Sequence, residues 1–120
     1  MPEKRFPPSV YRTGDEPDAR FTLANERTFL AWTRTALAMI AGGVALEALA
    51  LDLQPQLRLA ASLLLIGTGI VLAPAAYLDW MRTERALRRA APLPGSRMSV
   101  AIAVVVVVVG VLIVLGTLWR

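Results

Sequence analysis

The chain has 120 residues, of which 56% are hydrophobic and 18% charged, with a formal net charge of +4 and neither histidine nor cysteine. The absence of these two residue types excludes histidine-based acid–base catalysis, thiol nucleophiles, thiolate metal sites and disulfides. The carboxylates show no convergent pair for catalysis or for magnesium, so the sequence predicts no enzyme acting alone, no cofactor and no metal site.

Residues 1–20 (MPEKRFPPSVYRTGDEPDAR) form a polar leader. Its prolines, mixed charges and scarcity of aliphatic residues predict a flexible cytoplasmic arm rather than a helix. The first strongly apolar stretch begins only near residue 29, so we expect no cleavable export signal and a first span that stays in the membrane as an anchor.

The first membrane span is expected over residues 29–51 (FLAWTRTALAMIAGGVALEALAL). Its helix is expected to begin at the membrane surface with Thr22 as N-cap, because no proline interrupts the chain from there to Leu53. Arg34 lies inside this apolar run. A charge at such depth is costly in lipid and normally faces a protein interior or a water-filled cavity, so Arg34 marks the expected working surface.

One face of this helix combines arginines with small residues. At 100° per residue it comprises Arg27, Ala31, Arg34, Ala38, Ala41, Gly42 and Ala45. Small residues allow close packing of helices, so the face fits either contacts inside the protomer or the lining of a cavity shared between protomers.

The second span is expected over residues 58–79, with a kink or the local loss of one backbone hydrogen bond at Pro74 and a helix that continues to about Ala90. Tyr77 and Trp80 mark the membrane boundary. Three arginines then follow on one face of the helix at steps of three and four residues: Arg82, Arg85 and Arg89. They fit one of two roles. Either they orient the protein in the membrane and contact anionic lipid, or they form a vestibule that collects anions.

The third span is expected over residues 98–119 (MSVAIAVVVVVVGVLIVLGTLW). Three spans leave too few residues outside the bilayer for a separate soluble core. The sequence therefore predicts an all-α integral membrane protein, with three transmembrane helices per protomer forming one membrane domain over residues 21–120.

Basic residues concentrate on one side of the predicted spans. Six lie before or at the entrance to the first span and five between the second and third, whereas the other two regions carry one each, Arg58 and Arg120. This distribution predicts a cytoplasmic N-terminus and an external C-terminus. Because the basic residues flank membrane spans, we expect no nucleic-acid binding.

The charges in the spans require partners. Asp79, placed by the sequence at a depth similar to that of Arg34, is one candidate; Glu26 and a neighbouring protomer are others. Glu47 lies near the opposite boundary, about 140° around the helix from Arg34, and a structural ion pair with Arg58 is expected there.

The block LANERTFLAWTRTALAMIAG, residues 23–42, resembles the signature of the YidH family of small three-span bacterial inner-membrane proteins. This family is related to the membrane domain of the eukaryotic vacuolar transporter chaperone, a polyphosphate polymerase complex. The matching positions are Asn25, Glu26, Arg27, Thr28, Leu30, Ala31, Trp32, Arg34, Thr35 and Leu37.

The resemblance implies a bacterial inner-membrane protein and a pentamer around a pore, with first helices lining the path and basic residues engaging polyphosphate at its cytoplasmic mouth. It implies that Arg27 and Arg34 are such basic positions, with Glu26 beside them. The chain has neither the polymerase nor the phosphate-sensing domain of the complex, so the resemblance concerns its membrane part only.

Two functions fit these observations. In the first, a homo-oligomer forms a pore or translocation subunit for polyphosphate or other anions, with Arg27 and Arg34 at its entrance and Arg82, Arg85 and Arg89 in an outer ring. In the second, the protein is a non-conducting scaffold or regulatory subunit whose arginines hold anionic lipids or a partner protein.

Overall fold

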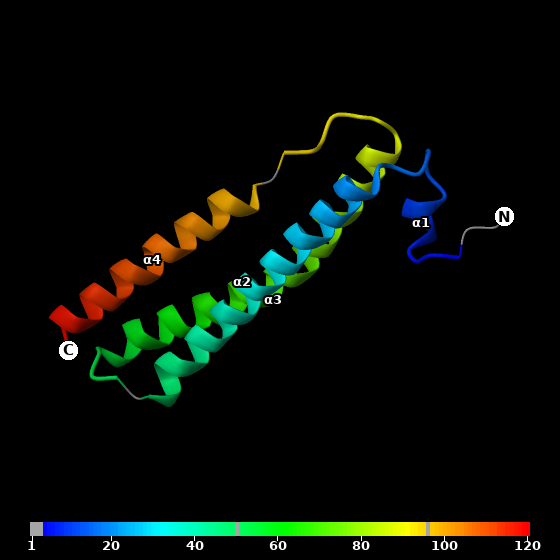
Figure 1. Cartoon of the computed structure of the whole chain (residues 1–120). Helices are drawn as coiled ribbons and strands as arrows, with labels where there is room; N and C mark the ends of the chain where they lie inside the picture. The colour runs from blue at the N-terminus through cyan, green and yellow to red at the C-terminus, as the bar shows by residue number, and fades with distance from the viewer. Residues whose placement is uncertain (1–3, 50, 96) are drawn as a thin grey trace.

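The structure is a computed structural model that describes residues 4–49, 51–95 and 97–120. Regular secondary structure in these ranges is entirely helical: α1 (Pro8–Tyr11), α2 (Ala19–Ala48), α3 (Pro55–Arg88) and α4 (Met98–Leu118). Figure 1 shows α2 and α3 lying antiparallel, with α4 alongside α3 and α1 next to the end of α3. The molecule is elongated, measuring 63 × 25 × 20 Å.

Three helices, α2, α3 and α4, are long and apolar enough to cross a membrane. The predicted fold class, an all-α membrane protein with three transmembrane helices per protomer, is therefore confirmed. Which terminus lies in the cytoplasm stays a prediction from the distribution of arginine.

The start of α2 differs from the prediction. The helix begins at Ala19 rather than after Thr22, because the Asp18 carboxylate accepts a hydrogen bond from the Arg20 amide (2.9 Å) and caps it. The first span therefore carries about three helical turns at its polar end before the apolar run starts at Phe29.

Helix α3 runs unbroken through Pro74, which is exposed. Proline has no backbone N–H, so the Ile70 carbonyl, four residues earlier, receives no helical hydrogen bond from position 74. The helix ends at Arg88 rather than at the predicted Ala90, which adopts a φ of 51° and so leaves the helical region.

Small residues bring α2 and α3 into close contact. The Ser62 hydroxyl on α3 donates a hydrogen bond to the Gly43 carbonyl on α2 (2.6 Å). A methyl group at Gly69 would lie 2.6 Å from the Ala36 carbonyl oxygen, so the site has no room for a side chain. Backbone contact of this kind is what small residues permit between membrane helices.

Helix α4 is attached more loosely. Only 6% of its apolar stretch is buried within the protomer, against 28% for α3. Its contacts centre on Val109, which packs with Leu46 and Ala61, and on the Gly116 carbonyl, which accepts a hydrogen bond from the Gln54 amide (2.9 Å). Most of its valine surface is therefore left for lipid or for other protein.

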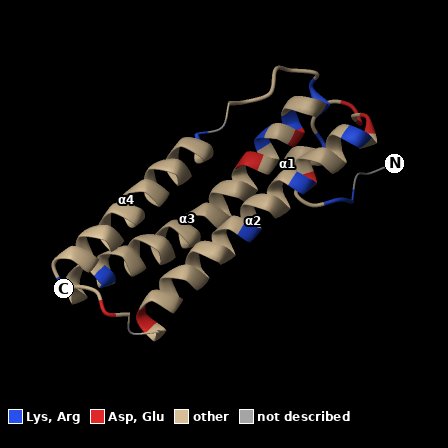
Figure 2. Ribbon diagram, turned by 60° about the vertical axis from the view of Figure 1, so that its left-hand side comes forward, with Lys and Arg blue, Asp and Glu red and all other residues tan. Residues whose placement is uncertain are grey.

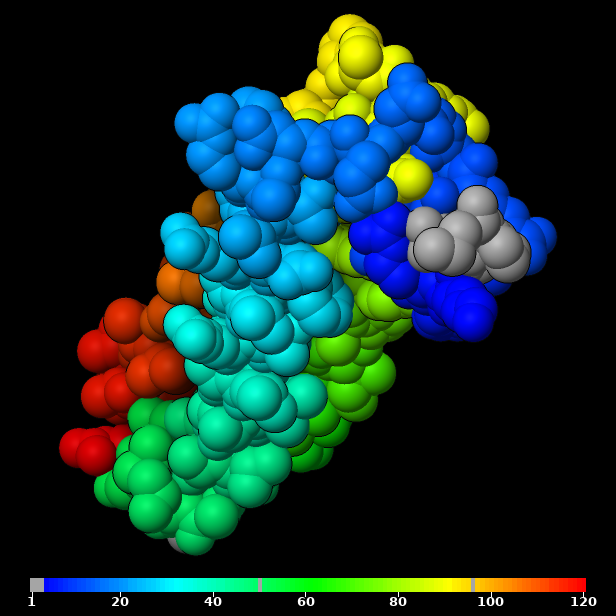
Figure 3. Space-filling model, turned by 45° about the vertical axis from the view of Figure 1, so that its right-hand side comes forward, coloured from blue at the N-terminus to red at the C-terminus, as the bar shows by residue number. Residues whose placement is uncertain are grey.

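The polar leader is held against the end of α3. Arg88 donates from Nε to the Thr13 carbonyl (2.7 Å) and from Nη2 to the Tyr11 carbonyl (2.8 Å), and Val10 is completely buried. Figure 3 shows the dark-blue leader lying over the yellow-green end of α3. The predicted flexibility of residues 1–20 stays a prediction, but the described part of the leader has specific contacts that composition did not indicate.

Gly14 makes this approach possible. It has a φ of 55°, and a methyl group there would collide with the Arg88 carbonyl oxygen. The same carbonyl accepts a hydrogen bond from the Asp15 amide (2.8 Å). The leader therefore docks through backbone that only glycine accommodates at this point.

Candidate functional site

Charged residues gather at one end of the bundle, here called the arginine-rich end. It comprises the described part of the leader, the start of α2, the end of α3 and residues 89–95 and 97, as Figure 2 shows in blue and red. At the opposite end the structure brings together Arg58 and Glu47, the predicted structural pair (Nε to Oε1, 3.4 Å), and also Arg120 and Asp52 (3.0 Å). The arginines of that opposite end are thus neutralised locally.

Aromatic rings mark the boundary level at the arginine-rich end. Phe29 on α2 meets Tyr77 on α3 edge to face at 6.3 Å, and Tyr77 stacks on Trp80 at 5.8 Å. Such rings prefer the membrane–water interface. Arg34, five residues beyond Phe29 along α2, lies about 7 to 8 Å further into the membrane at the helical rise per residue.

The predicted arginine stripe of α2 lies on the outside of the protomer. Its members from Arg27 to Ala41 are exposed, while Gly42 and Ala45 are partly buried. Helix α2 instead packs against α3 through a different face that includes Asn25, Ala36 and Gly43. Contact inside the protomer is therefore not the role of the stripe from Arg27 to Ala41. At its other end the stripe does meet α3, where a methyl group on Gly42 would lie 3.7 Å from Leu65 Cδ1.

The pairing of Arg34 with Asp79 does not occur within the described residues, nor does a pairing with Glu26. The helix register explains why: Asn25 contacts Trp80, and Ala36 lies opposite Gly69. Position 34 is thus level with about position 71 on α3, roughly 12 Å deeper than Asp79. The similar depth expected from the sequence was wrong.

The structure does bring three predicted arginines together at the end of α3. They line one shallow cavity of about 310 Å³ with the following loop: Arg82, Arg85 and Arg89. Arg85 also donates from Nη2 to the Ser9 hydroxyl of the leader (3.0 Å). This cluster and the α2 stripe lie on different helices, so they form two separate basic surfaces of the protomer.

A polar cluster that the sequence analysis missed joins α2 to α3. Glu84 is 1% exposed and accepts hydrogen bonds from the Thr22 hydroxyl (2.9 Å) and the Asn25 amide (3.2 Å). The same Asn25 amide group donates to the Trp80 carbonyl (3.0 Å). Asn25, part of the family-like block, therefore ties the two helices together rather than facing a ligand.

Helical periodicity contains a signal for this cluster. Ser62, Gly69 and Ala76 follow at seven-residue steps along the buried face of α3, and the next steps along that face lead to Glu84 and Arg88. Two charged residues on the extension of a packing face are expected to be buried with partners. The signal was available, but it required knowing which face of α3 meets α2.

The leader contact contains an acidic group with a perturbed pKa. Hydrogen bonds from Arg5 and then from Arg88 lower the pKa of Glu16 from 4.5 to about 2. Docking therefore favours the ionised carboxylate. Its contribution is complete above about pH 4.5 and is lost as the pH falls toward 2.

We expect the leader to become more mobile over this same acidic interval. Because the chain has no cysteine, a nitroxide on Arg12→Cys reports its mobility selectively. The spectrum should show a broad, immobilised component at neutral pH, and its lines should narrow as the pH falls from 4.5 toward 2. Glu16→Gln should be mobile throughout and Asp15→Asn should match the parent; a spectrum constant down to pH 2 in the parent contradicts the prediction.

Comparisons with known proteins agree with this architecture. Residues 20–86, which contain most of α2 and α3, match the family described as "Domain of unknown function (DUF202)". The chain is 45% identical over 105 residues to the inner membrane protein YidH of Escherichia coli, covering 87% of this chain and 91% of that protein.

The chain is also 46% identical over 100 residues to the uncharacterised protein Rv2272 of Mycobacterium tuberculosis, covering 82% of each. No solved structure matches it. The family match, these identities and the three apolar helices agree with one another. The chain therefore belongs to the DUF202 family, as a relative of YidH and a multi-pass protein of the inner membrane.

Proposed function

We propose that the protein assembles into a homo-oligomer whose protomers surround a path for anions, with Arg27 and Arg34 facing its cytoplasmic entrance. The observation that carries this proposal is the exposed arginine stripe of α2. An isolated protomer would present Arg34 to acyl chains without an ion-pair partner among the described residues. Neighbouring protomers remove this cost by enclosing the guanidinium in a hydrated space.

The close packing of α2 on α3 supports a path between protomers rather than through one. Gly43 and Gly69 bring the two backbones into contact, which leaves no room for an ion along this interface. The small residues that alternate with the arginines allow several copies of α2 to approach a common axis. We therefore assign the α2 stripe to the lining and α4 to the periphery.

Polyphosphate is the anion that this arrangement fits best. Guanidinium groups bind phosphate oxygens bidentately, and rings of arginine select anions in pores. A pentamer, the number implied by the family resemblance, would present two such rings of five arginines. The proposal includes no catalytic step.

The test is anion flux through the purified protein in liposomes loaded with polyphosphate. Arg34→Gln is expected to lower flux roughly tenfold or more, because each protomer loses one of the two arginines proposed to line the path. Arg12→Gln is the matched control, since it removes an exposed arginine of the leader instead. Unchanged flux through an Arg34→Gln protein that still assembles overturns the proposal.

The second candidate is a non-conducting scaffold or regulatory subunit that binds anionic lipid or a partner protein. The observation in its favour is the separate basic cavity formed by Arg82, Arg85 and Arg89 at the end of α3. A non-conducting scaffold of this kind predicts no anion flux through the parent protein. Flux that depends on Arg34 therefore decides between the two.

A further inference from the structure

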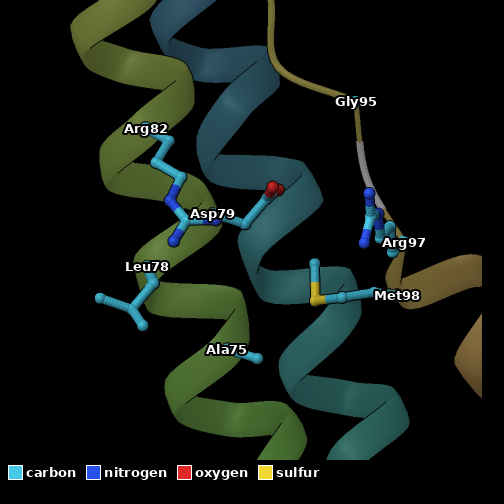
Figure 4. Close-up of a pocket in the computed structure, with 7 residues that line it drawn as sticks. All are labelled: Ala75, Leu78, Asp79, Arg82, Gly95, Arg97 and Met98. Atoms are coloured by element: carbon cyan, nitrogen blue, oxygen red, sulfur yellow. The ribbon is translucent and has the colours of Figure 1, made fainter.

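A second polar cavity lies where α3 meets the start of α4. It has a volume of about 430 Å³, and its charged lining consists of Asp79, Arg82 and Arg97. Figure 4 shows the Asp79 carboxylate projecting from α3 and Arg97 across the cavity from it, with Met98 below. Within the described residues, none of these three charged side chains forms a salt bridge.

This cavity continues into an apolar groove of about 500 Å³ between α3 and α4. Ala75 and Met98 line both, so the two spaces adjoin. Below them the groove is bordered mainly by aliphatic side chains, from Val71 to Leu63 on α3 and from Ala101 to Val105 on α4. Its polar member, Thr68, already donates its hydroxyl hydrogen to the Leu64 carbonyl (2.7 Å).

The depths of the two spaces match the two parts of a membrane lipid. Asp79 lies between Tyr77 and Trp80, whose stacked rings mark the interface, so the polar cavity is at headgroup level. The groove runs from there into the apolar stretch of α3, where acyl chains lie. The loose attachment of α4 leaves this space open along the protomer.

The charges select among headgroups. The two arginines suit a phosphate diester, to which guanidinium donates paired hydrogen bonds. Asp79 suits a primary ammonium, which offers hydrogen-bond donors as well as charge. A glycerol headgroup has no ammonium to pair with the Asp79 carboxylate, and a choline headgroup has no N–H to donate to it. The positive end of the α4 dipole, at Met98, adds attraction for the phosphate.

We propose that this cavity and groove bind one phospholipid with a phosphoethanolamine headgroup. Its phosphate contacts Arg82 and Arg97, its ammonium contacts Asp79, and an acyl chain lies in the groove between α3 and α4. The site lies away from the α2 stripe, so it is independent of the proposed anion path.

The test is native mass spectrometry of the full chain after removal of bound lipid. Phosphatidylethanolamine, phosphatidylglycerol and phosphatidylcholine are added in equal amounts. One phosphatidylethanolamine per protomer should be retained, preferred roughly tenfold over the other two, as one charge-assisted hydrogen bond implies. Asp79→Asn should abolish the preference, and Arg97→Gln should weaken all three. Asp52→Asn, at the opposite end of the molecule, is the matched control.

The groove is tested separately by filling it. Ala101→Trp should reduce phosphatidylethanolamine retention to the level of Arg97→Gln, whereas Ala103→Trp, an exposed position outside the groove lining, should not. Equal retention of all three lipids by the parent overturns the proposal. So does binding of free phosphoethanolamine or inorganic phosphate as tight as that of the lipid. A loss of oligomer rather than of lipid in Ala101→Trp also overturns it, because the groove would then hold a second copy of the chain.

Discussion

Gly69→Ala is expected to destabilise the protein by about 1–3 kcal/mol, the usual cost of forcing extra atoms into a packed interface. The added methyl group would lie 2.5 Å from Ile40 Cγ1 and 2.6 Å from the Ala36 carbonyl oxygen, so α2 and α3 must separate. The oxygen belongs to the backbone, which cannot rotate away as a side chain can. Thermal unfolding in mild detergent, followed by circular dichroism, measures the effect.

Gly67→Ala is the matched control for this change. It lies on the same helix two residues away, and a methyl group there meets no atom within 4 Å. Because alanine favours helix over glycine, this control should be neutral or slightly stabilising. Equal unfolding midpoints for the two variants would show that α2 and α3 do not pack as described.

Glu84→Leu is expected to cost about 1–3 kcal/mol for each hydrogen-bond donor that it leaves buried without an acceptor. The Thr22 hydroxyl loses its acceptor, whereas the Asn25 amide keeps the Trp80 carbonyl. The substitution therefore loosens α2 from α3 at the arginine-rich end. The same unfolding assay reports the loss.

Glu84→Gln is the control, since it retains an acceptor oxygen in the same shape and should recover most of the stability. A Glu84→Leu protein that unfolds at the parent midpoint would show that the buried carboxylate contributes nothing to the contact between the helices. If Glu84→Gln were as damaging as Glu84→Leu, the negative charge rather than the hydrogen bonds would be required.

Hydropathy was sufficient to predict the three helices because membrane spans are set by length and apolarity within a single segment. The predicted end of the third span, at residue 119, differs from that of α4 by one residue. The Glu47–Arg58 contact could also be predicted from the sequence, because both residues flank one short turn. The local sequence was therefore sufficient to predict this part of the structure.

The register between α2 and α3 could not be predicted from the sequence in the same way. Arg34 and Asp79 each lie near the arginine-rich end of a span, but depth counted separately for each helix ignores how far one slides along the other. Contacts of Gly69 with Ala36 and of Ser62 with Gly43 set that register. Such contacts depend on which faces meet, and glycine and serine leave little mark in a hydropathy profile.

The leader shows a third reason for failure. Its prolines and charges predict weak intrinsic structure, and α1, the one helix in its described residues, has only four residues. Its position depends instead on Arg88, whose guanidinium reaches leader carbonyls from the far end of α3. Contacts between segments more than seventy positions apart cannot be inferred from the composition of either segment.

The unequal attachment of α2 and α4 to α3 has a consequence for biogenesis. The tightly joined α2–α3 hairpin contains most of the intimate backbone contact, and it is complete once residue 88 has been made. The α2–α3 hairpin can thus associate before the last span packs against it. We expect the valine-rich α4 to join last and to dissociate first when the protein is extracted from the membrane, because so little of it is held by its own chain.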